Sequence, residues 1–313
     1  MTNPIPDNAS APRSASDGRP DQGSARTTTP TLPRRHDQTW PDNAVDIDLP
    51  NDARVHDALL GGAYNFHADR AFAGQLAAAV PDLLHDLYAE RHFMDRAIRA
   101  CANAGIRQFI DLGAGMPSAG NVRAEVGRTA RDARVLCVDL DPVVVELLTW
   151  MLRDDDQAAV VRADLRQPDD ILHHPTTRTL LDLDQPSAVV AVNVLHLLDQ
   201  PRTVIDRILQ PLPPGSFLIA SHLTADACPN DVATLAALTP ATGIAWTART
   251  RAEVEDQLFT GLTLVWPGVV YASRWRPDPG DDQMPNPRKG CIVTGVGRTP
   301  SVGVPHRRRT CEI

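Results

Sequence analysis

The chain has 313 residues, of which 42% are hydrophobic, and a formal net charge of −8 at pH 7. An acidic chain lacks the basic stripe that duplex nucleic acid requires, so we expect no nucleic-acid partner. No run approaches the ~20 apolar residues of a membrane-spanning helix, and the amino terminus lacks a charged-then-apolar signal. The sequence therefore predicts no membrane contact and a cytoplasmic location.

Cysteine usage argues against a cross-linked or metal-stabilised scaffold. The five cysteines are an odd number, and they are scattered along the chain at Cys101, Cys137, Cys228, Cys291 and Cys311. None belongs to a C-x-x-C pair or to a His/Cys ligand spacing, so the sequence predicts no disulfide framework and no metal site. Reduced thiols are the simplest expectation.

The chain divides by composition into four segments. Residues 1–45 are rich in Pro, Ser, Thr, Asn and Asp without apolar periodicity, which predicts a disordered tail. Residues 46–105 show helical periodicity and predict a helical leader or cap, ending near Gly105. Residues 106–298 form the main domain, and residues 299–313 are expected to fray.

Short apolar runs alternate with helical patterns through the main domain. Apolar strands that alternate with helices are typical of a doubly wound, mostly parallel α/β sheet. The last two runs have no helical pattern between them and predict an antiparallel pair. Seven strands are expected, at 108–112, 134–139, 158–163, 187–194, 216–221, 262–266 and 291–296.

A glycine-rich turn, FIDLGAGMPSAGN at 109–121, follows the first expected strand. A dinucleotide fingerprint has a third glycine, and Ser118 stands in its place after Gly113 and Gly115. Asp111 would repel a pyrophosphate but favours a positively charged ligand. S-adenosylmethionine carries a sulfonium and an ammonium and no phosphate, so the turn favours it over NAD.

An acidic residue also ends the second expected strand. Asp139 stands where a carboxylate is expected to hold ribose hydroxyls, and Leu140 beside it can pack on an adenine face. The alternative is that Asp139 and Asp141 cap the helix that begins at Pro142. We assign the cap to Asp141 and the ligand contact to Asp139.

The third and fourth expected strands end in further polar residues. Asp164 can accept from an adenine amino group, or it can be an ordinary turn aspartate. Asn193 is expected to face the reacting methyl group, and His196 follows within one turn. Because parallel strands end at one edge of the sheet, these residues are predicted to share a site with Asp111 and Asp139.

Several stretches resemble an actinobacterial family of S-adenosylmethionine-dependent class I methyltransferases with a Rossmann-like sheet. The similarity covers about residues 45–300 and is carried by ARVHDALLGGAYNFHADR, RQFIDLGAGMPSAGNV, VDLDPVVV, ADLRQP, VNVLHLL, TARTRAEVEDQLF and GVVYASRWRPD. The resemblance implies that Asp111, Gly113 and Gly115 surround the methionine part and that Asp139 holds the ribose. It further implies that Asp164 and Leu165 meet the adenine.

The resemblance also extends to the leader. It implies that Arg54, Tyr64 and Asn65 close over the cofactor, with Arg54 pairing with the cofactor carboxylate. The family often has Asn-x-His-Glu after the glycine turn, whereas this chain has NVRAE, with Arg123 in the histidine position. A chemical role for that histidine is therefore not available here.

Methyl transfer is an in-line displacement that needs mainly proximity and orientation, and a base only when the acceptor must lose a proton. His196 is the first candidate base and His222 the second, the alternative being histidines packed at strand ends. No Asn/Asp-Pro-Pro-aromatic loop follows the fourth strand, which disfavours planar amino acceptors. With the acidic charge, this favours a small molecule or another protein as the acceptor. Of the two we expect a small molecule, methylated on oxygen or nitrogen and roofed by the leader and residues 223–250.

Two other functions remain open. The chain could bind S-adenosylmethionine without catalysis, or it could be an NAD-dependent oxidoreductase on the same fold, against which Asp111 and Ser118 both argue. A homodimer is the assembly to test.

Overall fold

The computed structural model describes residues 45–117, 121–243, 245–279 and 290–300. They all lie in one compact unit, Pro33–Ile313, and the other unit, Met1–Leu32, is outside the described part. The predicted tails, 1–45 and 299–313, fall almost entirely outside the described residues, and so does Ser118. None of the helices that the structure describes is both long and apolar enough to cross a membrane.

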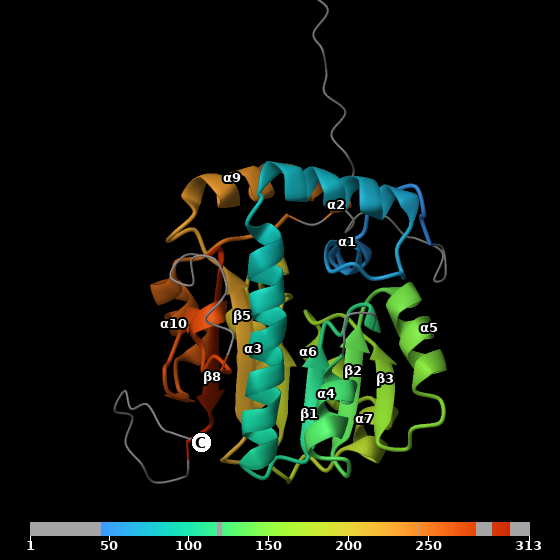
Figure 1. Cartoon of the computed structure of the whole chain (residues 1–313). Helices are drawn as coiled ribbons and strands as arrows, with labels where there is room; N and C mark the ends of the chain where they lie inside the picture. The colour runs from blue at the N-terminus through green and yellow to red at the C-terminus, as the bar shows by residue number, and fades with distance from the viewer. Residues whose placement is uncertain (1–44, 118–120, 244, 280–289, 301–313) are drawn as a thin grey trace, which may run out of the picture. The chain divides into compact units, whose positions relative to one another are not determined.

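The core is an eight-stranded sheet in the order β3-β2-β1-β4-β5-β8-β6, with β7 paired to β8 (Figure 1). The first five strands of this order are parallel, and β8 runs antiparallel to β5 and β6. This confirms the predicted doubly wound, mostly parallel sheet, including its antiparallel end. The strands are β1 Gln108–Leu112, β2 Arg134–Asp139, β3 Ala158–Arg162, β4 Ala188–Ala191, β5 Phe217–Leu223, β6 Thr263–Leu264, β7 Val270–Tyr271 and β8 Ile292–Arg298.

Several helices begin at residues whose side chains satisfy the free N–H groups of a first turn. Asn51 caps α1, Asp141 caps α5 ahead of Pro142, and Thr250 and Glu253 form the capping box of α10. The helices are α1 Asp52–Leu59, α2 His67–Ala79, α3 Leu83–Asn103, α4 Val122–Thr129, α5 Pro142–Met151, α6 Pro168–Leu172, α7 Pro175–Leu180, α8 Pro201–Leu209, α9 Pro229–Leu238 and α10 Arg251–Phe259, with short 3₁₀ turns η3 Leu195–Leu197, η4 Thr239–Thr242 and η5 Ala272–Arg274.

Helices cover both faces of the sheet. Successive strand residues point to opposite faces, so Phe109 packs with α3, α4 and α5, and its neighbour Ile110 packs with α6, α8 and α10. Both side chains are fully buried. The central strands therefore read as continuous apolar runs, which is why the sequence located them.

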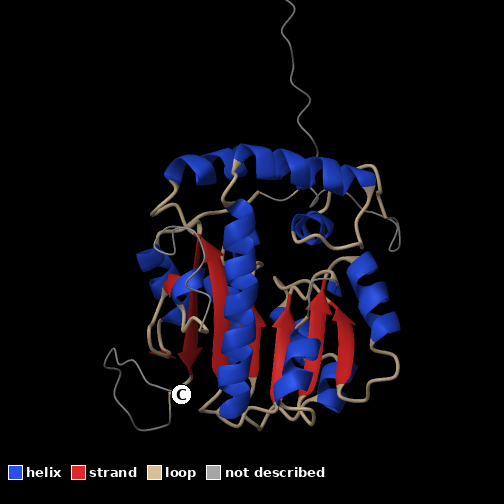
Figure 2. Cartoon of the chain, viewed as in Figure 1, coloured by secondary structure: helices blue, strands red, loops and turns tan. Residues whose placement is uncertain are grey.

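A third apolar core forms a cap over the end of the sheet toward which the parallel strands run (Figure 2). It joins α1, α2, the first turns of α3 and α9, with Phe72 and Leu235 among its buried members. The later turns of α3 pack on the sheet, where Phe93 meets Trp275 edge-on at 5.4 Å and the Arg96 Nε donates to the Trp275 carbonyl over 2.8 Å. Helix α3 thus links the cap to the sheet.

Candidate functional site

The turn after β1 is shaped by two glycines in the left-handed region. Gly113 has φ of +70° and Gly115 has φ of +64°. A Cβ on Gly113 would lie 2.6 Å from Cγ2 of Val194 in the turn after β4, so only glycine fits there. At Gly115 the nearest atom would be the Gly113 carbonyl oxygen at 3.9 Å, which leaves space beside the backbone.

Asp139 lies against this turn at the end of β2. Its two carboxylate oxygens accept from the backbone N–H groups of Gly115 and Asp141, each over 2.9 Å. Burial raises the pKa of Asp139 to about 6. The structure therefore brings Asp139 and the glycine turn together, as predicted, and places Asp141 as the α5 cap.

Asp111 is buried at the end of β1 with 6% of its surface exposed. Burial raises the pKa of the Asp111 carboxyl to about 7, and the Arg91 guanidinium on α3 opposes that rise. A buried carboxyl with so little compensation is stabilised by any cationic ligand that reaches it. Sequence reasoning missed Arg91 as its partner.

Asn193, just after β4, has the left-handed φ of +56°, which is uncommon for a residue other than glycine. Its backbone N–H donates to Ser221 Oγ over 2.8 Å, and that hydroxyl donates to the Glu90 carboxylate over 2.5 Å. Glu90 is buried, and burial raises its pKa to about 7. Ser221 on β5 and Glu90 on α3 therefore hold the turn after β4 in place.

One feature of the sequence could have indicated that Glu90 is a buried residue with specific partners. It lies on the buried stripe of α3, in line with Leu87 and Met94. An ionisable residue at a core position of an amphipathic helix needs partners, and the pattern alone does not say which.

The residues predicted to contact adenine differ in their burial and in their partners. The Asp164 carboxylate is held by Arg166, whose Nε lies 2.9 Å from both oxygens and whose backbone N–H also donates to it over 2.9 Å. Leu165 is buried, whereas Leu140 is 50% exposed. Their contacts with adenine stay predictions.

His196 lies in η3 and is buried, with its ring edge-on to Trp246 at a centroid distance of 5.0 Å. Burial, and then the charges of His222 and His56, hold its pKa well below the usual range. Among the described residues, neither ring nitrogen of His196 makes a hydrogen bond with the protein. The ring is therefore neutral at pH 7, and burial makes it a weaker base than an exposed histidine.

His222, on β5, has both ring nitrogens engaged. Arg249 Nη1 lies 2.8 Å from its Nε2, and its Nδ1 lies 2.8 Å from the Leu223 carbonyl. A guanidinium only donates, so Nε2 accepts and Nδ1 carries the proton. His222 is thus the weaker of the two candidate bases.

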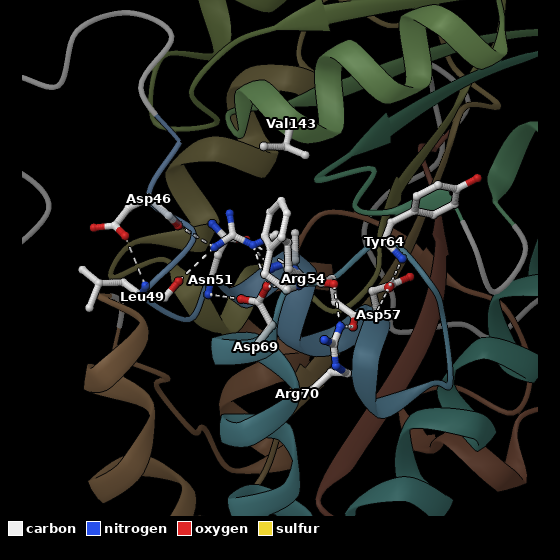
Figure 3. Close-up of polar contacts among 12 residues, drawn as sticks. Asp46, Leu49, Asn51, Arg54, Asp57, Tyr64, Asp69, Arg70 and Val143 are labelled. Atoms are coloured by element: carbon white, nitrogen blue, oxygen red, sulfur yellow. Dashed lines mark hydrogen bonds and ion pairs between the residues drawn. The ribbon is translucent and has the colours of Figure 1, made fainter.

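Arg54 is buried in the leader (Figure 3). Its Nε pairs with Asp69 at 2.8 Å, and its Nη2 donates to the carbonyls of Asp46 and Leu49 at 3.0 and 2.9 Å. Its guanidinium also lies 5.1 Å from the centre of the Phe66 ring. These contacts stabilise the leader, and pairing with a cofactor carboxylate stays a prediction.

The Tyr64 backbone contacts Asp57 of α1 (Figure 3). The Asn65 side chain contacts the same carboxylate. One oxygen of the buried Asp57 carboxylate accepts from the Tyr64 backbone N–H at 2.9 Å and the Asn65 amide at 2.7 Å. Its other oxygen, Oδ1, is buried and has no hydrogen-bond partner among the described residues. A buried acceptor without a donor is costly, so this atom offers a place for a ligand donor.

Two sets of hydrogen bonds tie the start of α1 to the rest of the molecule. Asn51 Nδ2 donates to Asp141 Oδ2 at 2.7 Å, next to Asp139. Asp52 Oδ1 accepts from Thr242 Oγ1 at 2.9 Å and from Trp246 Nε1 at 3.1 Å. The start of α1 therefore meets Thr242 and Trp246, and Trp246 lies beside His196.

Arg123 stands where the family that the sequence resembles often has a histidine. Its guanidinium pairs with Asp155. Its Nε lies 2.6 Å from Asp155 Oδ2 and its Nη2 lies 3.1 Å from Asp155 Oδ1, which ties α4 to the turn before β3. A paired guanidinium there serves packing rather than proton transfer.

A family described as S-adenosyl methyltransferase matches residues 38–300 of the chain. The chain belongs to this family. No curated protein sequence matches the chain. The chain is similar to solved crystal structures. One is a "putative methyltransferase" from Thermobifida fusca YX, with 38% sequence identity and a TM-score of 0.77. The match covers 84% of this chain and 100% of that protein. A DUF574 family protein from Streptomyces avermitilis, at 33% identity and a TM-score of 0.78, covers 82% and 100%.

The cofactor of this methyltransferase family is S-adenosylmethionine, and the described residues fit it. The carboxyl groups of Asp111 and Asp139 flank the glycine turn, which disfavours a pyrophosphate and favours a cationic ligand with hydroxyl donors. The open space at Gly115 and the unpartnered Oδ1 of Asp57 supply room and a further acceptor. An oxidoreductase that uses NAD is not supported.

Proposed function

We propose that the chain transfers a methyl group from S-adenosylmethionine to an oxygen or nitrogen of a small-molecule acceptor beneath the cap. The observation that carries this proposal is the meeting of Asp111, Asp139 and the turn after β4 at the strand ends, with the leader fastened above them. Parallel α/β sheets bind ligands at this edge.

The cofactor residues of this proposal follow from the strand ends. Asp111, Gly113 and Gly115 hold the methionine part and Asp139 the ribose hydroxyls. The remaining assignments are Leu140, Asp164 and Leu165 at the adenine, Asn193 toward the methyl group, and Arg54, Tyr64 and Asn65 in the closing leader. When bound, S-adenosylmethionine supplies an electrophilic methyl group on its sulfonium.

His196 is the proposed general base for an acceptor that must lose a proton. Its lowered pKa keeps the imidazole neutral at pH 7, and its ring nitrogens are not bonded to other described residues. The role requires a ring nitrogen within hydrogen-bond reach of the acceptor. Trp246 and the leader around Asp52 would limit the access of water to this ring.

Further parts of the proposal concern the whole protein. The division into a leader at 46–105 and a methyltransferase domain at 106–298 is proposed from sequence pattern. A cytoplasmic location and a homodimer are likewise proposals, to be tested by fractionation and by sedimentation of the full chain.

The function is tested by binding and then by labelling. Calorimetry should show binding of S-adenosylmethionine and none of NAD, and the reverse result would end the proposal. A cell extract incubated with the enzyme and methyl-labelled donor should then yield a labelled small molecule. Cofactor binding without any labelled product would favour a binding module that has lost the chemistry, the reading in which Arg123 stands for a lost catalytic histidine.

A further inference from the structure

A second cluster of reactive side chains lies outside the site described above, between the start of α9 and the residue before β8. The side chains of Cys228, Asp231 and Cys291 place one sulfur or oxygen atom each within 4.8 Å of one another. Cys228 and Asp231 are half-buried, and Cys291 is buried. No part of the proposed methyl transfer uses them.

Two segments that are distant in the sequence bring this cluster together. Cys228 is the N-cap of α9, and Asp231 lies in the first turn of that helix. Cys291 precedes β8, where its carbonyl accepts from Thr224 N over 2.7 Å and its own N–H donates to Asp86 Oδ2 over 2.6 Å. The backbone around Cys291 is therefore held from β5 and from α3.

The surroundings of the two thiols are negatively charged. The charged groups that act on Cys228 are the carboxylates of Asp82, Asp86 and Asp231. A divalent cation would complement this field.

We propose that Cys228, Cys291 and Asp231 form a binding site for a divalent metal ion of the zinc type. Two sulfur ligands and one carboxylate suit Zn²⁺. Mg²⁺ and Ca²⁺ prefer oxygen ligands alone, so this set of ligands does not suit them. Three protein ligands leave one position of a tetrahedral ion for water, and the half-buried Cys228 and Asp231 provide the way in. Both thiols lose their protons on binding.

The site would act on structure rather than on methyl transfer. It would fasten the N-terminus of α9, part of the cap, to the start of β8. Asp86 would hold the Cys291 backbone from outside the ligand set, as outer partners of metal ligands commonly do. A ligand that binds only the folded chain raises its stability in proportion to its occupancy.

The test uses the full chain, free of any affinity tag, stripped with a chelator and kept reduced. Titration with Co²⁺ should give a sulfur-to-cobalt charge-transfer band that saturates at one ion per chain. Cys228→Ser should lose the band and Asp231→Asn should weaken the binding of Co²⁺, whereas Cys311→Ser, the matched control, should keep both. Cys228 is the better variant because Cys291 is fully buried and its change could disturb folding.

A second readout is the melting temperature. Zn²⁺ should raise it for the wild type and for Cys311→Ser, while Mg²⁺ should not, and the rise should vanish in Cys228→Ser. The proposal is overturned if the wild type gives no charge-transfer band. It is equally overturned if the band survives in Cys228→Ser or disappears in Cys311→Ser.

Discussion

The side-chain amide of Asn51 donates to a carboxylate oxygen of Asp141 across 2.7 Å, joining the first residue before the leader helix α1 to the cap of α5. The other Asp141 oxygen accepts from Val143 N over 2.7 Å. Asn51 Oδ1 in turn accepts from Ala53 N and Arg54 N. Two helix caps are thus one hydrogen-bonded unit, and this unit adjoins Asp139.

We expect Asn51→Ala to lower the free energy of unfolding by about 2–3 kcal/mol, because it removes a helix cap and leaves an oxygen of the half-buried Asp141 carboxylate without its partner. Asn121→Ala is the matched control. Asn121 caps α4 through Ala124 N only, so its loss should cost about 1 kcal/mol. Equal costs in urea unfolding would show that the bond to Asp141 contributes nothing.

Asp139→Ala should weaken the binding of S-adenosylmethionine by about 1–3 kcal/mol, since ligand hydroxyls lose their acceptor. Asp139→Asn keeps one acceptor oxygen and should lose less. Calorimetry measures both, and urea unfolding separates lost ligand contacts from a loosened turn at Gly115. A normal affinity in Asp139→Ala would assign Asp139 to holding the turn alone.

His196→Gln should lower kcat by about 10²–10⁴-fold for an acceptor that loses a proton, with little change in the affinity for S-adenosylmethionine. The single-turnover rate with the labelled acceptor is the measurement. His222→Gln is the comparison, because both His222 nitrogens are already engaged by Arg249 and Leu223. If His222→Gln abolished turnover and His196→Gln did not, the assignment would be reversed.

The stability of Asp111→Asn should depend on pH in a defined direction. In the unfolded chain Asp111 ionises near the ordinary aspartate pKa of 3.8, whereas burial raises its pKa to about 7 in the fold. From about pH 4 to 7 the native wild type retains a proton that the unfolded chain has lost, so its stability falls as pH rises. Asparagine does not titrate, and the variant therefore gains relative to wild type by up to about 1.4 kcal/mol per pH unit.

Urea unfolding at pH 5 and pH 7.5 measures that gain. Asp169→Asn serves as control, because Arg207 lowers the pKa of that exposed carboxyl and its titration is complete below this range. The difference between Asp169→Asn and wild type should stay constant. A constant difference for Asp111→Asn as well would contradict the raised pKa of Asp111.

The sequence predicted best what depends on neighbouring residues. The strands 108–112 and 134–139 match β1 and β2 to the residue, because buried parallel strands are continuous apolar runs. The fourth strand was predicted at 187–194 but ends at Ala191, since the left-handed backbone of Asn193 leaves the ladder. Strand β7 was missed because two residues carry no periodicity.

Partners from distant segments could not be predicted. Glu90 and Ser221 meet because α3 packs on β5, and no pattern in either segment specifies the other. Cys228 and Cys291 are likewise far apart in the sequence, and only the fold brings them together. The strand ends are different, because parallel topology alone gathers Asp111 and Asp139 at one edge.

Gly113→Ala tests the close approach of the turns after β1 and β4. The change forces a Cβ at φ of +70° and within 2.6 Å of Val194 Cγ2. Gly61→Ala provides the strain without the clash, since Gly61 has φ of +74° and nothing within 4 Å of the added atom. We expect about 1–2 kcal/mol of destabilisation for Gly61→Ala and at least about 1–3 kcal/mol more for Gly113→Ala.

The clash component can be removed separately. Val194→Ala deletes the atoms that the new Cβ would meet, so the double variant should be more stable than the sum of the two single changes predicts. A double-mutant cycle in urea measures this coupling, which residues in contact commonly show at 0.5–3 kcal/mol. The double variant should also regain affinity for S-adenosylmethionine relative to Gly113→Ala, because the turn can return to its place beside Asp139. Additive costs would mean that the two turns do not constrain each other.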